Sequence, residues 1–178
     1  MSSPLSYPIE LDAQAIEEVL PHRGEILCVR RITVLDCNHC IGHVIWAPDL
    51  PILQGHFPSM PMVPGALLIE AVAQVAGAGM LVGDVLARSM RGSHVGVLAG
   101  VRKCSFKRPV QGDEWVRVEV RSRQMSAMAA AISAQLQIGA EEVASIDLLL
   151  VNTPRSMSIK PLLSEYPPAA EEAAVFLR

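Results

Sequence analysis

One apolar segment, residues 65–83, constrains the fold of this chain more than any other. It reads GALLIEAVAQVAGAGMLVG, and its only polar side chains are those of Glu70 and Gln74. A helix that is apolar on all sides is normally buried on all sides. Alanines and glycines contribute little to membrane insertion, and a glutamate in mid-helix opposes it. We therefore predict a buried central helix and no membrane span.

The rest of the chain is rich in β-strand patterns. Residues 115–121, WVRVEVR, alternate apolar and polar side chains, as a strand with one buried face does. A short helix is predicted over 10–20, and the proline-rich residues 47–64 are predicted to form a loop. Strands, the first two of them a hairpin, are predicted over 26–35, 40–46, 94–107, 115–123, 128–138 and 143–152. A curved antiparallel sheet wrapped around the long helix would bury most of it, so we predict an α+β fold.

Length and composition limit the classes of protein. With 178 residues, 51% of them apolar, the chain is long enough for one domain, which we place at 1–152, and a tail at 153–178. Only a short helix near 169–177 is expected in the tail. The net charge of -3 argues against binding nucleic acid through bulk charge. The N-terminus lacks a signal-peptide pattern, so we expect a cytoplasmic protein whose four cysteines are free thiols.

Acid–base chemistry is indicated by Glu70 and by a histidine just upstream of the helix. A glutamate held in apolar surroundings can stay protonated near neutral pH and act as an acid. Gln74 lies one helical turn away on the same face, where its amide can orient the carboxyl group. His56 lies in a Gly-His-Phe-Pro sequence whose neighbouring prolines would stiffen the loop. The alternatives are an ordinary loop histidine and a structural Glu–Gln pair at a subunit contact.

The start of the long helix offers a place for negative charge. Pro64 suits the first helical position, and neither Met62 nor Val63 can cap the helix with a side-chain oxygen. The first N–H groups, beginning with that of Gly65, would then lack a local acceptor and could bind a developing negative oxygen. Water or another loop filling these hydrogen bonds is the simpler alternative.

A cysteine- and histidine-rich turn invites a zinc interpretation. Neighbouring positions on a short hairpin point to opposite faces, and no second cysteine pair follows at zinc-ribbon spacing. We therefore expect no metal site at Cys37, His39, Cys40 and His43.

A basic cluster stands out in this slightly acidic chain. It could contact an acidic carrier protein or a phosphate group, although a solvated strand end is at least as good an explanation. Its members are Arg102, Lys103, Lys107 and Arg108.

Several motifs, taken in order, resemble one enzyme family. Their order and spacing over residues 12–150 are similar to those of the 3-hydroxyacyl-[acyl-carrier-protein] dehydratases of the hotdog fold, and most similar to the FabZ type. The blocks are LPHR at 20–23, GHFP at 55–58, PMVPGALLIEA at 61–71 with AQ at 73–74, and FKRPV at 106–110 with GD at 112–113.

The resemblance implies a fold, an assembly and a site. The fold would be a central helix wrapped by the sheet, and the assembly a homodimer with a continuous sheet, with a trimer of dimers left open. The site would lie at the dimer contact, with His56 from one subunit acting on the C2 proton. Glu70 from the other would assist departure of the C3 hydroxyl, and the Gly65 amide would hold the thioester carbonyl. The substrate would be linked to acyl carrier protein, and we expect no cofactor.

The sequence departs from the family beside these residues but not at them. Residues 24–31 and 47–53 lack the usual aromatic-containing runs, and residues 153–178 exceed what the core needs. Acyl chain length and pathway therefore stay open, with fatty-acid synthesis and a specialised lipid or polyene route as candidates. A hotdog thioesterase and a non-catalytic acyl-carrier-binding subunit are the alternative functions. A dehydratase releases water and a thioesterase releases a free thiol, so the products separate these two enzymes. A non-catalytic subunit would gain nothing from burying a glutamate, which argues against that alternative.

Overall fold

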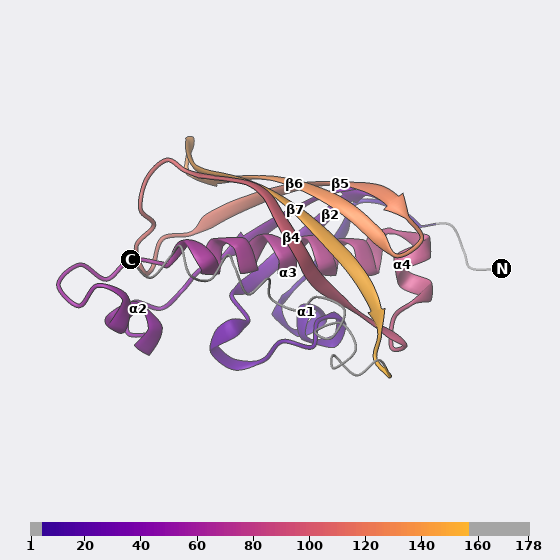
Figure 1. The fold of residues 1–178 in the computed structure, drawn as a ribbon, viewed down its shortest axis with the longest axis horizontal. Helices are drawn as coiled ribbons and strands as arrows, with labels where there is room; N and C mark the ends of the chain where they lie inside the picture. Colours follow the sequence, from indigo (N-terminus) through magenta and orange to yellow (C-terminus); the bar gives the residue numbers. More distant parts are fainter. Residues whose placement is uncertain (1–4, 157–178) are drawn as a thin grey trace, which may run out of the picture.

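A seven-stranded antiparallel sheet curves around one long helix, α3 (Gly65–Gly83), in the computed structural model of this protein (Figure 1). The structure describes residues 5–156, and all elements named here lie in that range. The strands are β1 Ile9–Leu11, β2 Val29–Asp36, β3 His39–Val44, β4 His94–Phe106, β5 Val116–Ser126, β6 Ala129–Ile138 and β7 Glu141–Pro154. The short helices are α1 Ala13–Val19, α2 Pro51–His56 and α4 Val85–Ser89, with a 3-10 turn at Gly24–Ile26. The predicted α+β hotdog architecture is confirmed.

The strand order is β1-β2-β3-β5-β6-β7-β4, so β1 and β4 form the two edges of the sheet. β4 pairs with β7, the last strand in sequence, rather than with a sequence neighbour. Side chains alternate along each strand, and one face of the sheet is buried against α3. In β7 the buried row consists of Ala144, Ile146, Leu148 and Leu150.

α3 is buried where it faces the sheet but not all round. A Cβ atom on Gly79 would lie 2.5 Å from Cys40 Sγ, and one on Gly83 would lie 2.5 Å from Val34 Cγ1. These glycines therefore let the helix lie directly against β2 and β3. Glu70 and Gly77 on another face are only partly buried. The prediction that every face of the helix is buried is wrong for a single chain.

By length and mean hydropathy, 1.7 over its most apolar window, α3 could cross a membrane. In the fold it is instead the core helix, and Val72, Val75 and Ala76 are fully buried. The prediction that this helix is not a membrane span therefore agrees with the structure.

Residues 47–64 are not the continuous loop that the sequence predicted. Residues 51–56 form α2, which begins at Pro51 and buries Leu53. A proline is tolerated in the first turn of a helix because its missing N–H would have no partner there. A helix of six residues is too short to show a helical spacing of apolar residues. The prolines were then the strongest local signal, and they predicted a loop. His56 consequently ends a helical turn instead of lying in a loop.

The predicted helix over 10–20 is shorter than expected. Residues 9–11 form the edge strand β1, and α1 begins after Asp12, whose side chain accepts a hydrogen bond of 2.9 Å from the Ala15 N–H. Asp12 is a regular helix-capping residue, and it marks the boundary that apolar spacing alone missed. The predicted helix near 169–177 lies outside the described residues.

Candidate active site

The Glu70 carboxyl group is held through one of its two oxygens. Gln74 Nε2 lies 2.8 Å from Glu70 Oε1, which is the contact expected from their spacing, and His22 Nε2 lies 3.3 Å from the same oxygen. Oε2 has no hydrogen-bond partner among residues 5–156. The Glu70 side chain is 29% exposed in the single chain, so it is less buried than predicted. One oxygen is therefore fixed while the other is free to contact a ligand.

Gln74 is itself fixed by its surroundings. It is 1% exposed, and its Nε2 also donates to the Ile26 carbonyl at 2.7 Å. Because Ile26 O and the Glu70 carboxylate both accept, the NH₂ group of the amide must face them. Desolvation by burial raises the pKa of the Cys28 thiol to about 12, so it stays protonated and can donate to Gln74 Oε1 at 3.7 Å. Hydrogen bonds therefore hold both the nitrogen and the oxygen of the Gln74 amide.

His22 is a site residue to which the sequence analysis assigned no role. It belongs to the LPHR block, which was read only as a marker of the family, and that block was the available signal. The Arg23 guanidinium holds this loop by donating to the carbonyls of Leu20 and His22 at 2.7 and 2.6 Å. His22 Nδ1 is buried and has no partner in the described part of the chain. The histidine therefore reaches the site through Nε2, the atom that faces Glu70.

A backbone contact determines which nitrogen of His56 carries the proton. Its Nδ1 lies 3.3 Å from the Met62 carbonyl oxygen. Since a carbonyl can only accept, this contact requires the proton on Nδ1 and leaves the lone pair on Nε2. The imidazole is exposed and packs at 4.4 Å, between ring centroids, against Phe57. Within the described chain, no contact joins His56 to Glu70.

The start of α3 has no side-chain cap, as the sequence predicted. The N–H of Gly65 has no acceptor within the part of the chain that the structure describes. A Cβ atom at position 65 would lie 2.6 Å from the Phe106 ring, so a larger residue there would have to displace that ring. Pro64 is the N-cap residue and not the first helical residue that the sequence predicted, since its ψ of 138° lies outside the helical range; its carbonyl accepts from the Leu67 N–H at 2.9 Å. The first amide of the helix is therefore available to a negative oxygen.

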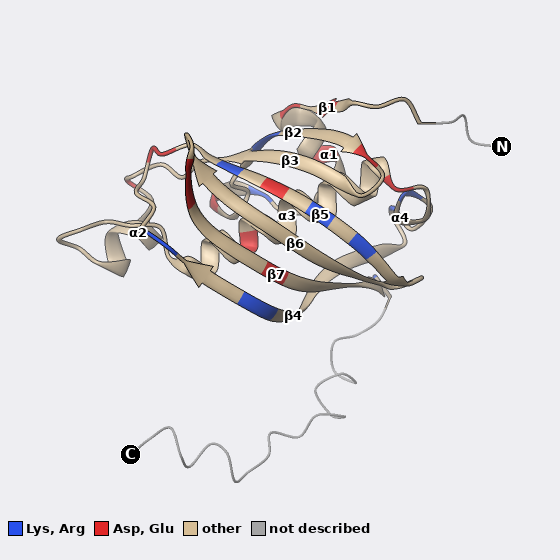
Figure 2. Ribbon diagram, turned by 90° about the horizontal axis from the view of Figure 1, so that it is seen from above, with Lys and Arg blue, Asp and Glu red and all other residues tan. Residues whose placement is uncertain are grey.

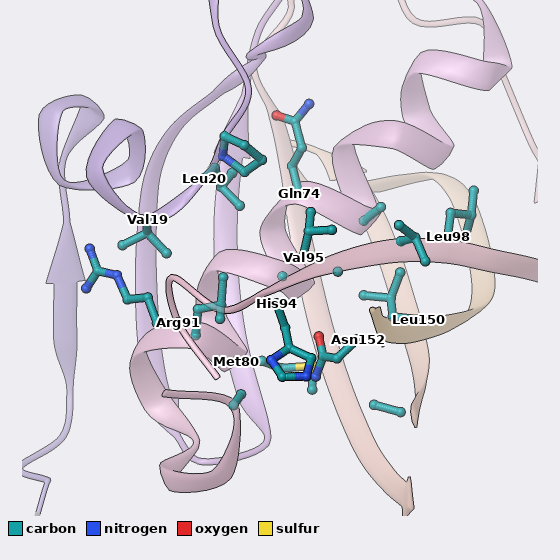
Figure 3. A pocket seen from close by; sticks show the side chains of 18 of the residues that line it. Val19, Leu20, Gln74, Met80, Arg91, His94, Val95, Leu98, Leu150 and Asn152 are labelled. Carbon is teal, nitrogen blue, oxygen red and sulfur yellow. The ribbon is translucent and has the colours of Figure 1, made fainter. Parts of the chain in front are cut away.

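A cavity of about 350 Å³ opens beside Glu70 and follows α3 (Figure 3). Its walls come from the loop after α1, from one face of α3, and from the sheet edge formed by β4 and β7. From Glu70 to Leu81, which both line it, the helix rises roughly 16 Å at about 1.5 Å per residue. His56 does not line this cavity. Residues of α4, β5 and β6 also line it, so elements distant in sequence build the cavity and no local pattern could have predicted it.

The residues of the zinc interpretation do not converge. Cys40 faces inward, with its Sγ 3.7 Å from the Val75 carbonyl, and burial raises the pKa of its thiol to about 12. His39 faces outward, with Nε2 2.8 Å from Glu119 Oε1. No group of three or more metal-binding side chains occurs among the described residues.

The predicted basic cluster is divided in two. Lys107 Nζ lies 2.6 Å from Glu142, and Arg108 pairs with Glu114 at 3.1 Å and with Glu141 at 2.9 Å. Arg102 and Lys103 lie exposed on the edge strand β4 (blue in Figure 2) and form no ion pair with a described residue. Only this second pair of cations is free for a partner.

Comparison with known proteins identifies the class to which this fold and site belong. The model of the FabA-like domain matches residues 20–147. The 3-hydroxyacyl-[acyl-carrier-protein] dehydratase FabZ of Bacillus pumilus (strain SAFR-032) is 36% identical over 111 residues, which are 62% of this chain and 74% of that protein. The enzyme of the same name from Caldanaerobacter subterraneus subsp. tengcongensis is 34% identical over 144 residues, 79% of this chain and 97% of that one.

The solved structures agree on the fold. The dehydratase heterocomplex ApeI:P from Xenorhabdus doucetiae superimposes with a TM-score of 0.66 at 17% identity, covering 89% of this chain and 99% of that one. The class is thus the hotdog-fold dehydratases. The chain belongs to the FabA-like family, and the relatives that resemble it in sequence are FabZ-type 3-hydroxyacyl-[acyl-carrier-protein] dehydratases.

Proposed function

We propose that this protein removes water from 3-hydroxyacyl thioesters carried by acyl carrier protein, giving trans-2-enoyl thioesters for fatty-acid or related lipid or polyene biosynthesis. The observation that supports this most directly is the Glu70 carboxyl group, anchored at one oxygen beside a cavity of about 350 Å³. An acid fixed next to room for an acyl chain is what elimination of a C3 hydroxyl requires. The FabZ relatives supply the carrier-linked substrate class.

The chemistry divides between two side chains and one backbone amide. His56 Nε2 takes the C2 proton, and the electron pair left on C2 forms the C2–C3 double bond. Glu70 gives its proton to the departing C3 hydroxyl, which leaves as water. The Gly65 N–H stabilises the negative charge that develops on the thioester oxygen. Gln74 and His22 then donate to the carboxylate that remains on Glu70.

A second copy of the chain completes the proposed site. His56 and Glu70 do not meet within one chain, so one would come from each subunit. β4 is an edge strand that pairs with β7 on one side only, and its other, open edge is a template for pairing with another chain. Exposed apolar side chains along β4 support this contact: Val97, Leu98, Val101 and Phe106. A trimer of such dimers would need a further surface, and a mass measurement in solution distinguishes the two assemblies.

The carrier protein would approach the proposed dimer near the basic residues. Of the four basic residues in the cluster, Arg102 and Lys103 are exposed and have no ion pair to a described residue, so they are better candidates than Lys107 and Arg108. The four cysteines, Cys28, Cys37, Cys40 and Cys104, are free thiols, which agrees with a reducing compartment. We therefore also propose a cytoplasmic location.

Product analysis tests the function. The purified protein is mixed with a 3-hydroxyacyl thioester, and both the enoyl product and free thiol are measured over time. Enoyl thioester without thiol release is expected. Thiol release without enoyl product would identify a thioesterase, and neither product would leave a non-catalytic subunit.

Mixing variants tests the shared site. His56→Ala and Glu70→Gln subunits, each inactive alone, are co-refolded so that mixed dimers form. In a mixed dimer one of the two sites holds both intact residues, so partial recovery of activity is expected. If verified mixed dimers stay inactive, both residues act from the same chain.

A further inference from the structure

The cavity beside Glu70 passes over a glycine that packing does not require. Gly65, Gly79 and Gly83 of α3 each face an atom that an added Cβ would approach to 2.6 Å or less. At Gly77 the nearest such atom is Leu20 Cδ2 at 3.9 Å, an ordinary contact distance. Glycine in a helix interior is less favourable than alanine. Gly77 therefore costs stability without a packing reason, and the room it leaves belongs to the cavity.

The middle of this cavity and the end remote from Glu70 differ in chemistry. The lining of the middle includes the apolar side chains of Ala73, Leu98 and Leu150. At the end remote from Glu70, beside Met80, the lining includes His94 and Asn152 (Figure 3), and the cations Arg91 and Arg155 also line the cavity. An acyl chain reaching from the acid along α3 would therefore meet polar groups at its far end.

The polar end interrupts an apolar pattern. Ala144, Ile146, Leu148 and Leu150 form the inward row of β7, and the next inward position is Asn152. Asn152 pairs with Gly96 of β4, and His94 lies two residues along that strand on the same face. Gly96 has no side chain to separate the two. The inward face of the sheet therefore becomes polar at this end of the cavity.

Asn152 and His94 both have hydrogen-bonding capacity to spare. The Asn152 side-chain amide makes no hydrogen bond to any residue of 5–156, although it can both donate and accept. His94 Nδ1 lies 2.8 Å from Ser93 Oγ, which leaves Nε2 unused within the described chain. An alkyl chain covering these groups would deprive them of water without replacing its hydrogen bonds. A hydroxyl group would satisfy both, since it donates once and accepts twice.

We propose that the cavity selects 3-hydroxyacyl chains that pass over Gly77 and carry a hydroxyl group at the far end, recognised by Asn152 and His94. This inference rests on the proposed dehydratase function. It names a substrate class, long chains with a hydroxylated terminus, that an entirely apolar cavity would disfavour.

The test compares two pantetheine thioesters of equal length, 3-hydroxytetradecanoyl and its ω-hydroxy counterpart, whose chains are long enough to reach from Glu70 to the far end of the cavity, with 3-hydroxybutanoyl as a short reference. The wild-type protein is expected to dehydrate the ω-hydroxy chain with a kcat/KM roughly tenfold above that of the plain chain, as one or two neutral hydrogen bonds allow. Asn152→Leu continues the apolar row of β7 and should reverse the preference. Gln135→Leu, which also replaces a side-chain amide by leucine but on the exposed outer face of β6, should leave the preference intact.

The outcomes separate the two proposals. If the protein dehydrates none of the three substrates, the proposed function fails. If it dehydrates the short reference but prefers the plain long chain, or treats both long chains alike, the hydroxyl inference is wrong. The same holds if Asn152→Leu keeps the wild-type preference.

Substitutions at Gly77 test independently whether the acyl chain passes over this residue. Gly77→Leu fills the passage and should lower kcat/KM for both long chains at least tenfold relative to the short reference. Gly77→Ala adds only a methyl group and should have a smaller effect in the same direction. Equal losses for long and short chains in a Gly77→Leu protein with unchanged circular dichroism would show that the acyl chain takes another path.

Discussion

The side of α3 that packs on the sheet and the side that lines the cavity differ in what determines their residues. On the sheet side, Val72 and Val75 are fully buried and Gly79 leaves no room for a methyl group. On the cavity side, Glu70 is partly exposed and Gly77 has space above it. Packing density determines the residues of the first side, and in the proposed function the bound substrate determines those of the second. Matched substitutions on the two sides can separate stability from activity.

The largest effect is expected at the acid. Glu70→Gln keeps the shape of the side chain and removes the proton that we propose it transfers, so kcat should fall about 10²–10⁴-fold while KM changes little. Glu119→Gln makes the same change on the outer face of the sheet, where Glu119 contacts Arg117 and His39, and should leave kcat unchanged. Both constants are measured with a 3-hydroxyacyl thioester. A Glu70→Gln protein that binds weakly but turns over normally would make Glu70 a substrate-positioning group.

The next effect concerns the amide that holds the acid. Gln74→Leu removes the donor to Glu70 and leaves the Ile26 carbonyl and the Cys28 thiol without their partner. Unfolding free energy should fall by about 1–3 kcal/mol, and kcat should fall as well. Denaturant titration and steady-state kinetics on the same sample measure the two changes. An unaltered kcat would show that Gln74 serves the fold and not the site.

A matched pair of alanines compares the two sides of α3 directly. Gly77→Ala should raise the unfolding free energy by up to about 1 kcal/mol, because alanine is the better helix former and has room there. Gly79→Ala should instead lower it by about 1–3 kcal/mol, because its methyl group would lie 2.5 Å from Cys40 Sγ. Chemical denaturation of both variants gives the sign of each change. If both variants changed the unfolding free energy in the same direction, the sheet would have to move to make room at Gly79. The two sides of α3 would then not differ in packing.

The smallest effect is expected on the outer face of the sheet, where hydrogen bonds from Arg117 and then from His39 hold the pKa of Glu119 below its ordinary value. A carboxyl group with a depressed folded-state pKa stabilises the protein above its unfolded-state pKa. That contribution disappears as the pH falls through the folded-state value. The stability difference between the parent and Glu119→Gln should therefore be present at neutral pH, stay below about 1 kcal/mol, and vanish in acid. A difference that grows on acidification would contradict this sign.

Local patterns predicted the parts of this molecule that depend on near neighbours in sequence. Strand alternation located β2 to β7 within a few residues, and a spacing of four placed Gln74 against Glu70. The contact between His22 and Glu70 spans 48 positions and depends on how the loop after α1 docks on α3, which no periodicity records. The helix α2 was missed because six residues with prolines around them do not make a pattern.

The strand order has a consequence for how the chain is made. β4 pairs with β7 and with no other strand of the described structure, so during synthesis it leaves the ribosome before its partner exists. The apolar side chains of β4, among them Val97, Val101 and Phe106, therefore stay exposed to solvent until residues 141–154 have been synthesised. The wall of the cavity, and the edge proposed to meet a second subunit, are consequently the last parts to be assembled. A nascent chain that stalls before β7 would have its central helix and most of its sheet but neither surface that the proposed chemistry needs.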